Sequence, residues 1–280
     1  YGILISTSHC EPMMRNTNGE WRKAGLGDYN FVTNAKQVVH FWEERVKELS
    51  GSDCLYTLGM RGVHDSAMEG AKTIPEQVKV LTDVLKVQRD LLAMHVNAQV
   101  DKVPQQFIPY KEVLDCYHSG LQVPDDVTLI WCDDNYGYIR HFPTEQERTR
   151  KGGHGMYYHA SYWGRPHDYL WLATTPPELI HAEMQRAYRH GVDKVWVLNV
   201  GDIKPAEYLI SLFVDMAWRA VGLGRTNSVP TWRVGMKSSW AWKARSSYRY
   251  GKHIMIFRSN FVPNFLAGPE RRRKTRNINW

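Results

Sequence analysis

The sequence predicts an α/β fold, an incomplete (β/α)8 TIM barrel in which about six strand–helix units are visible. Short apolar runs rich in strand-forming residues alternate with helix-like sequence through the first 218 residues. A cluster of polar and aromatic residues follows nearly every run, as in a barrel that gathers its site from many strand ends. A doubly wound sheet also fits the alternation, but its phosphate-binding signatures, Walker A and G-x-G-x-x-G after a strand, are missing. The six runs are Gly2–Ser6, Cys54–Gly59, Gln106–Pro109, Val127–Cys132, Gly155–Ala160 and Val192–Val200.

Two of these runs, VTLIWC at 127–132 and VWVLNV at 195–200, are apolar almost without a break. Such runs are typical of parallel strands that are covered on both faces. A complete barrel needs eight strands, so we expect at least two strands upstream of this chain. The N-terminal YGILIST has neither a starting Met nor the features of a signal peptide. The chain begins directly with sequence typical of a core strand, and we expect it to be truncated there.

The helices between the runs carry start and stop signals. Asn34 is a candidate N-cap for the first helix, and Thr73–Glu76 reads as a capping box with a proline in the first turn. Thr175–Glu178 repeats this device, and its helix is expected to stop near Gly191. A last helix is expected over residues 205–218. Apolar residues at helical spacing predict one buried face for each of the first two helices.

Composition excludes several classes of protein. A hydrophobic content of 43% fits a globular chain, and no run of about 18 apolar residues predicts a membrane span. The four cysteines show no C-x-x-C spacing, so no zinc or redox motif follows from them. An aromatic content of 12% suits either sugar-stacking surfaces or an ordinary core.

Charge divides the chain into two parts. Residues 219–280 hold fourteen Lys or Arg and one acid, Glu270, whereas residues 1–218 are net acidic. We interpret 1–218 as a partial (β/α)-barrel catalytic domain. Residues 219–280 are interpreted as a basic, atypical tail that is out of frame or disordered, with a genuine basic binding tail as the alternative. Neither a nucleic-acid nor a membrane partner is expected.

The polar clusters at the strand ends combine carboxylates, histidines, an arginine, an asparagine and tyrosines. This inventory suits a sugar acid, because arginine pairs with carboxylates in a fork and aromatic faces pack on sugar C–H surfaces. Two carboxylates that flank a glycosidic bond would complete a glycosidase. No G-x-S-x-G serine elbow is present.

Each cluster also has an alternative reading. Single acids at strand ends often cap helices or pair with a neighbour, and Asp202 with Lys204 is such a candidate pair. A metal-dependent barrel hydrolase is a second alternative. Its candidate ligands are Asp133, Asp134, His9, His64 and His159.

The clusters resemble glycoside hydrolase family 115, the xylan α-1,2-glucuronidases, over about residues 1–218, and the resemblance is expected to stop near Trp218. The segments that carry it are SHCEPMMRN at 8–16, TLGMRG at 57–62, WCDDNYGY at 131–138, YYHASYWGRPHDYL at 157–170 and NVGDIKPAE at 199–207. The resemblance implies a catalytic barrel set between further domains. It also implies removal of α-1,2-linked glucuronic or 4-O-methylglucuronic acid from xylan with inversion, and no cofactor. The implied partner is glucuronoxylan, and the parent enzyme is expected to be secreted.

Carried over by motif, Glu112 and Asp65 are the implied catalytic carboxylates, with Glu112 favoured as the acid and Asp65 as the base. Arg61 lies four residues before Asp65 and would hold either that carboxylate or the substrate's own. The residues implied to bind the uronic acid are His9, Arg61, Asp133, Asn135, Tyr157, His159 and Tyr162. Taken alone, the chain is expected to be poorly stable and inactive. A catalytically inactive carbohydrate-binding remnant is the alternative function.

Overall fold

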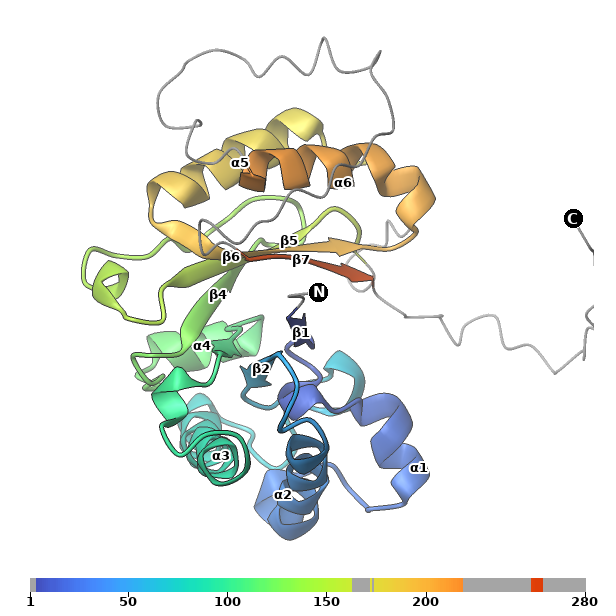
Figure 1. Ribbon diagram of the computed structural model, residues 1–280, viewed down its shortest axis with the longest axis vertical. Coiled ribbons are helices and arrows are strands. Elements are labelled where there is room, and N and C mark those ends of the chain that lie inside the picture. The colour runs from blue at the N-terminus through green and yellow to red at the C-terminus, as the bar shows by residue number, and fades with distance from the viewer. Residues whose placement is uncertain (1–3, 163–171, 173, 219–252, 259–280) are drawn as a thin grey trace, which may run out of the picture.

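One curved sheet with helices packed around it forms the body of the protein (Figure 1). The computed structural model describes residues 4–162, 172 and 174–218, and the backbone of 253–258. Within these residues, seven strands form a single sheet, and all neighbouring strands are parallel. The strands are β1 (Ile5–Ser6), β2 (Cys54–Leu58), β3 (Gln105–Phe107), β4 (Thr128–Cys132), β5 (His154–His159), β6 (Val192–Val200) and β7 (His253–Arg258).

The strand order separates the two folds that the alternating sequence allows. In a doubly wound sheet the strand order reverses at a switch point, whereas in a barrel each strand is added on the same side of the previous one. Here every strand pairs with the one before it, from β1 through β7. The fold is therefore of the barrel type, and closure into a full (β/α)8 barrel stays a prediction.

Two apolar cores show that the sheet is curled. Leu55 on β2 and Val197 on β6 belong to the same inner cluster although three strands lie between them, so the concave face of the sheet encloses that cluster. The larger outer core lies between the sheet and the helices. The inner cluster consists of Leu55, Ile108, Tyr110, Ile130, Tyr157, Val195 and Val197.

The helices cover the outside of the sheet (Figure 1). They are α1 (Arg22–Ala24), α2 (Phe31–Glu48), α3 (Ile74–His95), α4 (Glu112–His118), α5 (Pro177–Arg189) and α6 (Ile203–Trp218). Short 3-10 turns occur at Pro12–Met14, Val63–Asp65, Val100–Lys102 and Glu147–Thr149, and a π turn occurs at Thr17–Trp21. Among the described residues no helix is both long and apolar enough to span a membrane.

The helix starts confirm one predicted cap and correct two. The capping box between Thr73 and Glu76 is present. For α2 the N-cap is Asn30, whose side chain accepts two backbone N–H groups, and the helix begins four residues earlier than expected. Asn34 instead donates from its amide to the carbonyls of the preceding loop. Helix α5 begins after Pro176 without a side-chain cap, so the second capping box is wrong.

A layer of polar side chains inside the sheet joins its first three strands. The amide of Gln106 on β3 donates to Ser6 Oγ on β1 and to Thr57 Oγ1 on β2, both at 2.9 Å. Thr57 in turn donates to the backbone carbonyl of Thr7. Because Gln106 and Thr57 have no exposed surface, these bonds are shielded from water and fix the ends of β1 and β2 relative to each other.

Strand β7 lies inside the segment that was predicted to be an atypical tail. It pairs with β6 over six residues, from Val195 opposite His253 to Val200 opposite Arg258. A strand of the sheet therefore occurs beyond Trp218, within the segment interpreted as a basic, atypical tail. The short apolar run IMIF at 254–257 is flanked by basic residues, and the high charge of the segment obscures it in the sequence. The division into two domains stays a prediction.

Candidate active site

Strained backbone marks the loops at the carboxyl ends of the strands. Six non-glycine residues in the described chain have positive φ, a conformation that persists only where surrounding structure enforces it. All six follow the ends of β1 through β4, where a barrel enzyme places its site. They are Met13, Met14, His64, Asp65, Lys111 and Asn135.

Arg61 is the centre of the candidate site. It lies three residues after β2, and 3% of its surface is exposed. Its Nε and Nη2 donate to the two carboxylate oxygens of Glu112, each at 2.9 Å, in a bidentate fork. Its Nη1 donates to the backbone carbonyl of Asp65 at 3.0 Å and also contacts the Asp65 carboxylate. One buried guanidinium thus bridges the two predicted catalytic carboxylates.

The Asp65 carboxylate collects basic side chains from three loops. Besides Arg61, His9 Nε2 lies 2.8 Å from Asp65 Oδ1, and Lys111 Nζ donates to Asp65 Oδ2 at 3.0 Å. His9 follows β1, and Lys111 follows β3. Two cations and an imidazole therefore face Asp65, whereas Arg61 is the single cation paired with Glu112 in the described chain. This arrangement surrounds the Asp65 carboxylate with positive charge.

His9 is neutral at this site. Burial lowers its pKa well below the ordinary value of 6.5, and the nearby Arg61 charge lowers it further. A neutral ring that donates from Nε2 to Asp65 carries its lone pair on Nδ1. That Nδ1 atom is buried and has no hydrogen-bond partner among the described residues.

The lowered histidine pKa values predict a stability that depends on pH. Burial also lowers the pKa of His154 and of His141. Below about pH 6.5 the unfolded chain binds protons that the folded protein excludes, so the free energy of unfolding should decrease as the pH falls. The slope reaches about 1.4 kcal/mol per pH unit for each such histidine. Urea unfolding at pH 7.5, 6.5 and 5.5 measures it.

His9→Gln should flatten this slope. His40→Gln, at an exposed position on α2, should leave the slope unchanged and serves as the matched control. A free energy of unfolding that stays constant or rises between pH 6.5 and 5.5 would contradict this account of the buried histidines.

Asp133 orients His159 from beneath the site. Its Oδ1 accepts from the His159 backbone N–H at 3.1 Å and lies 2.6 Å from His159 Nδ1. Its Oδ2 accepts from the backbone N–H groups of Asn135 and Gly137. The Asp133 side chain has no exposed surface. Asp133 therefore holds His159 in place, and its predicted contact with the uronic acid stays a prediction.

Aromatic rings pack in a continuous layer next to Arg61. The ring of Tyr110 lies 4.4 Å from that of His9 and 6.0 Å from that of His159, centre to centre. Tyr157 and Tyr162 contact His159 edge to face. Burial raises the pKa of the Tyr110 and Tyr157 hydroxyls well above 10, so both stay protonated. These rings are more than nine-tenths buried, and substrate contact by Tyr157, His159 and Tyr162 stays a prediction.

Two asparagines complete the layer. Tyr110 donates its hydroxyl to Asn135 Oδ1 at 3.0 Å, and Asn199 on β6 donates its amide to the Tyr157 hydroxyl. The structure thus connects all nine predicted site residues in one network. Sequence reasoning missed Tyr110, Lys111 and Asn199 as members. Their only signal was their place within strand-end clusters.

The remaining strand-end candidates have other tasks. Lys204 pairs with Glu207 at 3.3 Å, so the predicted pair with Asp202 is wrong. Asp134 accepts two backbone N–H groups of its own loop and contacts Arg140. Residues 163–170 of the YYHASYWGRPHDYL segment lie outside the described residues. Within the described chain no group of three His, Cys, Asp or Glu side chains could hold a metal ion.

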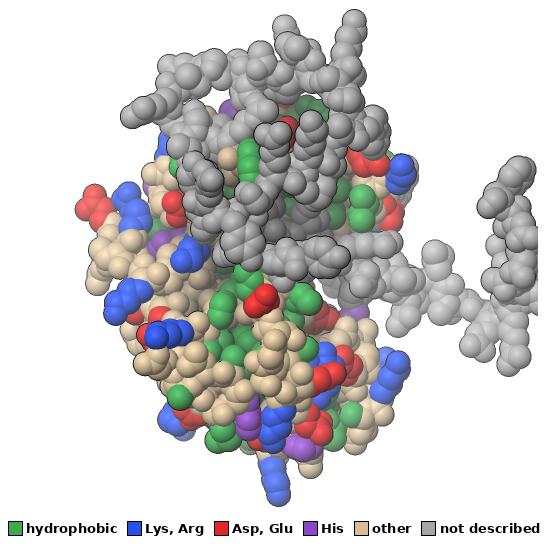
Figure 2. Space-filling model, viewed as in Figure 1, with side chains coloured by type: hydrophobic (Ala, Val, Ile, Leu, Met, Phe, Trp, Pro, Cys, Tyr) green, Lys and Arg blue, Asp and Glu red, His purple; other side chains and the backbone are tan. Residues whose placement is uncertain are grey.

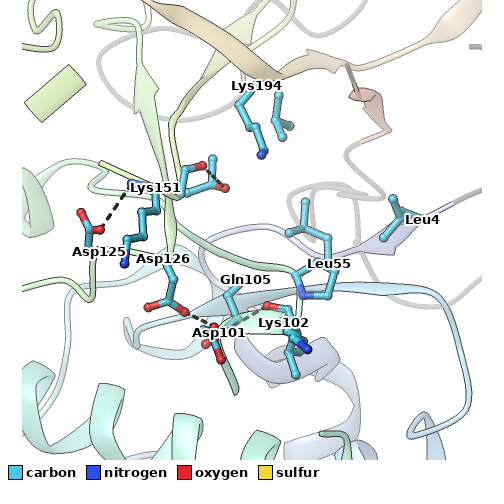
Figure 3. A pocket seen from close by; sticks show the side chains of 14 residues that line it. Leu4, Leu55, Asp101, Lys102, Gln105, Asp125, Asp126, Lys151 and Lys194 are labelled. Atoms are coloured by element: carbon cyan, nitrogen blue, oxygen red, sulfur yellow. Dashed lines mark hydrogen bonds between the residues drawn. The ribbon is translucent and has the colours of Figure 1, made fainter. Parts of the chain in front are cut away.

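A cavity of about 440 Å³ opens at the opposite, amino-terminal end of the strands (Figure 3). Leu4, Leu55 and Val195 line its apolar floor, and Lys102 and Lys194 lie among the charged residues at its edge. In barrels this end serves stability, while catalytic residues follow the other ends of the strands. The cavity therefore does not mark the active site.

A parallel barrel-type sheet with two carboxylates and a bridging arginine at its strand ends is the arrangement in which a (β/α)-barrel glycosidase would place its catalytic pair. Residues 1–245 match glycosyl hydrolase family 115, and the chain belongs to that family. The match extends beyond Trp218, where the resemblance was expected to stop.

Among solved structures, the chain is similar to a family GH115 4-O-methyl-alpha-glucuronidase with specificity for decorated arabinogalactans. The two are 63% identical with a TM-score of 0.78, over 80% of this chain. The chain spans 30% of the length of that protein. Comparison with curated proteins gives no match.

Proposed function

We propose that the protein containing this chain removes α-linked glucuronic acid or 4-O-methylglucuronic acid from a decorated polysaccharide, with inversion at the anomeric carbon. The observation that carries the proposal is the Arg61 bridge between Asp65 and Glu112 at the ends of β2 and β3. An inverting glycosidase needs one carboxylic acid to protonate the leaving oxygen and one carboxylate to activate water, about 6.5–9.5 Å apart. Because Arg61 lies between Asp65 and Glu112, it keeps the two carboxylates apart, as an inverting mechanism requires.

The surroundings of the two carboxylates divide their roles. Asp65 contacts Arg61 and Lys111, and we assign it as the general base because two cations next to a carboxylate favour its charged form. Glu112 has Arg61 alone and is assigned as the acid. Arg61 holds both Glu112 oxygens in the structure, so protonation of Glu112 requires that a competing anion take over part of the fork. The carboxylate of a bound uronic acid supplies that anion.

The remaining polar groups suit the hydroxyls of a sugar ring. Half-buried Asn135 lies at the surface of the site, whereas the His9 Nδ1 atom is buried below it with no hydrogen-bond partner among the described residues. Tyr110 and Tyr157 keep their protons and act as neutral hydroxyls in the layer below. Asn135 would contact the sugar directly, and the buried layer would support it without adding negative charge next to the sugar's carboxylate.

Two polysaccharides are candidate substrates. The motif resemblance implies glucuronoxylan, whereas the solved structure at 63% identity is of an enzyme specific for decorated arabinogalactans. That degree of identity favours a decorated arabinogalactan. Either polymer lies outside the cell, which supports a secreted parent enzyme.

The function is tested by incubating the parent protein with glucuronoxylan and with a glucuronidated arabinogalactan. We expect free uronic acid from the arabinogalactan, with the β anomer appearing first in ¹H NMR spectra. Retention of the α configuration would contradict inversion. Binding without release would favour the inactive remnant. Loss of activity with a chelator would favour the metal-dependent alternative.

A further inference from the structure

We propose that Tyr136 and Tyr138 form a platform on which the main chain of the polysaccharide docks beside the site. The inference rests on the proposed function, because an enzyme that trims side groups must hold the polymer outside the pocket for the side group. The two tyrosines are 51% and 52% exposed. The proposed ligand of this platform is the main chain of the polysaccharide. The alternative is that the two tyrosines bind another protein, and the test below must distinguish the two.

The position of the two tyrosines favours a carbohydrate. They lie in the loop after β4, on either side of Gly137. The preceding residue, Asn135, accepts the Tyr110 hydroxyl at the site, so the same loop carries a site residue and the platform. The other large aromatic side chains with comparable exposure in the described chain, Tyr208 and Trp218, lie on α6.

The backbone of the loop is held in place at both tyrosines. Asp134 Oδ1 accepts the backbone N–H groups of Tyr136 at 2.9 Å and Tyr138 at 3.1 Å. Between them, Gly137 has a φ of +90° and accepts the Tyr158 hydroxyl at 2.9 Å. A Cβ at this position would lie 2.8 Å from that hydroxyl, so only glycine fits. A rigid loop loses little entropy when a ligand binds.

The chemistry of the exposed rings suits a neutral sugar chain. Tyrosine offers a flat apolar face for sugar C–H groups and a hydroxyl for sugar oxygens. On the face shown in Figure 2, the described part carries basic and acidic side chains side by side instead of a single-sign patch.

The test compares a polymer with a small substrate in the parent protein. Tyr136→Ala and Tyr138→Ala should each raise KM for glucuronidated arabinogalactan roughly threefold to tenfold. Both variants should leave kcat/KM for a 4-nitrophenyl α-glucuronide unchanged, since that substrate has no main chain. Tyr136→Phe and Tyr138→Phe should restore most of the polymer KM, because the ring face is retained.

Tyr208→Ala is the matched control, an equally exposed tyrosine on α6 that should affect neither substrate. Equal losses on both substrates, an unchanged polymer KM, or a change in oligomeric state that accompanies the loss would overturn the platform. Release of uronic acid from the small substrate by the unaltered protein tests the proposed function separately. A failure of the platform is then distinguishable from a failure of that function.

Discussion

Glu112→Gln should reduce the release of uronic acid from the polysaccharide about 10³-fold. The amide keeps the size of the side chain and can still accept from Arg61, but it cannot deliver a proton to the leaving oxygen. A 4-nitrophenyl leaving group needs little protonation, so the same variant should lose far less activity on 4-nitrophenyl α-glucuronide. Initial rates on the two substrates, with circular dichroism to confirm folding, measure the difference.

Asp65→Asn should lose activity on both substrates by a similar factor, because water activation is needed whatever the leaving group. Asp115→Asn is the matched control, an exposed carboxylate on α4 three residues after Glu112. It should retain the activity of the unaltered protein. If Asp65→Asn were the variant rescued by the good leaving group, the acid and base roles would be reversed.

Arg61→Lys should lower activity on both substrates by about 10²-fold or more, although the charge is kept. A lysine ammonium cannot form a fork with Glu112 and reach Asp65 at once, so the two carboxylates lose their fixed separation. Arg61→Met should in addition reduce the free energy of unfolding by about 3 kcal/mol, because it leaves both carboxylates without their buried partner. Initial rates and urea unfolding measure the two effects.

Arg89 provides the control for Arg61. It is partly buried, pairs with Asp126 at 2.8 Å and donates to Gln105, near the amino-terminal end of the sheet. Arg89→Lys should lower stability modestly and leave kcat unchanged. If Arg61→Lys behaved in the same way, Arg61 would be a structural residue without a role in catalysis.

The strands were predictable because their signal is local. Apolar runs such as residues 127–132 and 195–200 cannot be solvated, so they identified β4 and β6 directly. The Thr73–Glu76 capping box is likewise a short-range pattern, and it located the start of α3. The cap of α2 was misplaced because Asn30 and Asn34 offer the same side chain. Only the course of the preceding loop selects Asn30.

The site was predictable in its members but not in their geometry. The family resemblance predicted Asp65, Glu112 and Arg61 as residues of the same site. The fork from Arg61 to Glu112 joins residues 51 positions apart, and no sequence spacing reveals it. Burial of Asp133 was equally hidden, because a carboxylate at a strand end looks the same whether it faces substrate or holds a histidine. Strand β7 escaped prediction because basic sequence surrounds its short apolar run.

The central claim is that Arg61 and Glu112 act as one unit with Asp65. A double-mutant cycle tests it most directly, with uronic acid release from the polysaccharide measured for Arg61→Lys, Glu112→Gln and the double variant. When two residues act as one unit, removing the second adds little to the loss caused by the first. The activity of the double variant should therefore be within a few-fold of that of the less active single variant. If the two losses instead multiplied, the residues would contribute independently, and the bridge would not be the basis of catalysis.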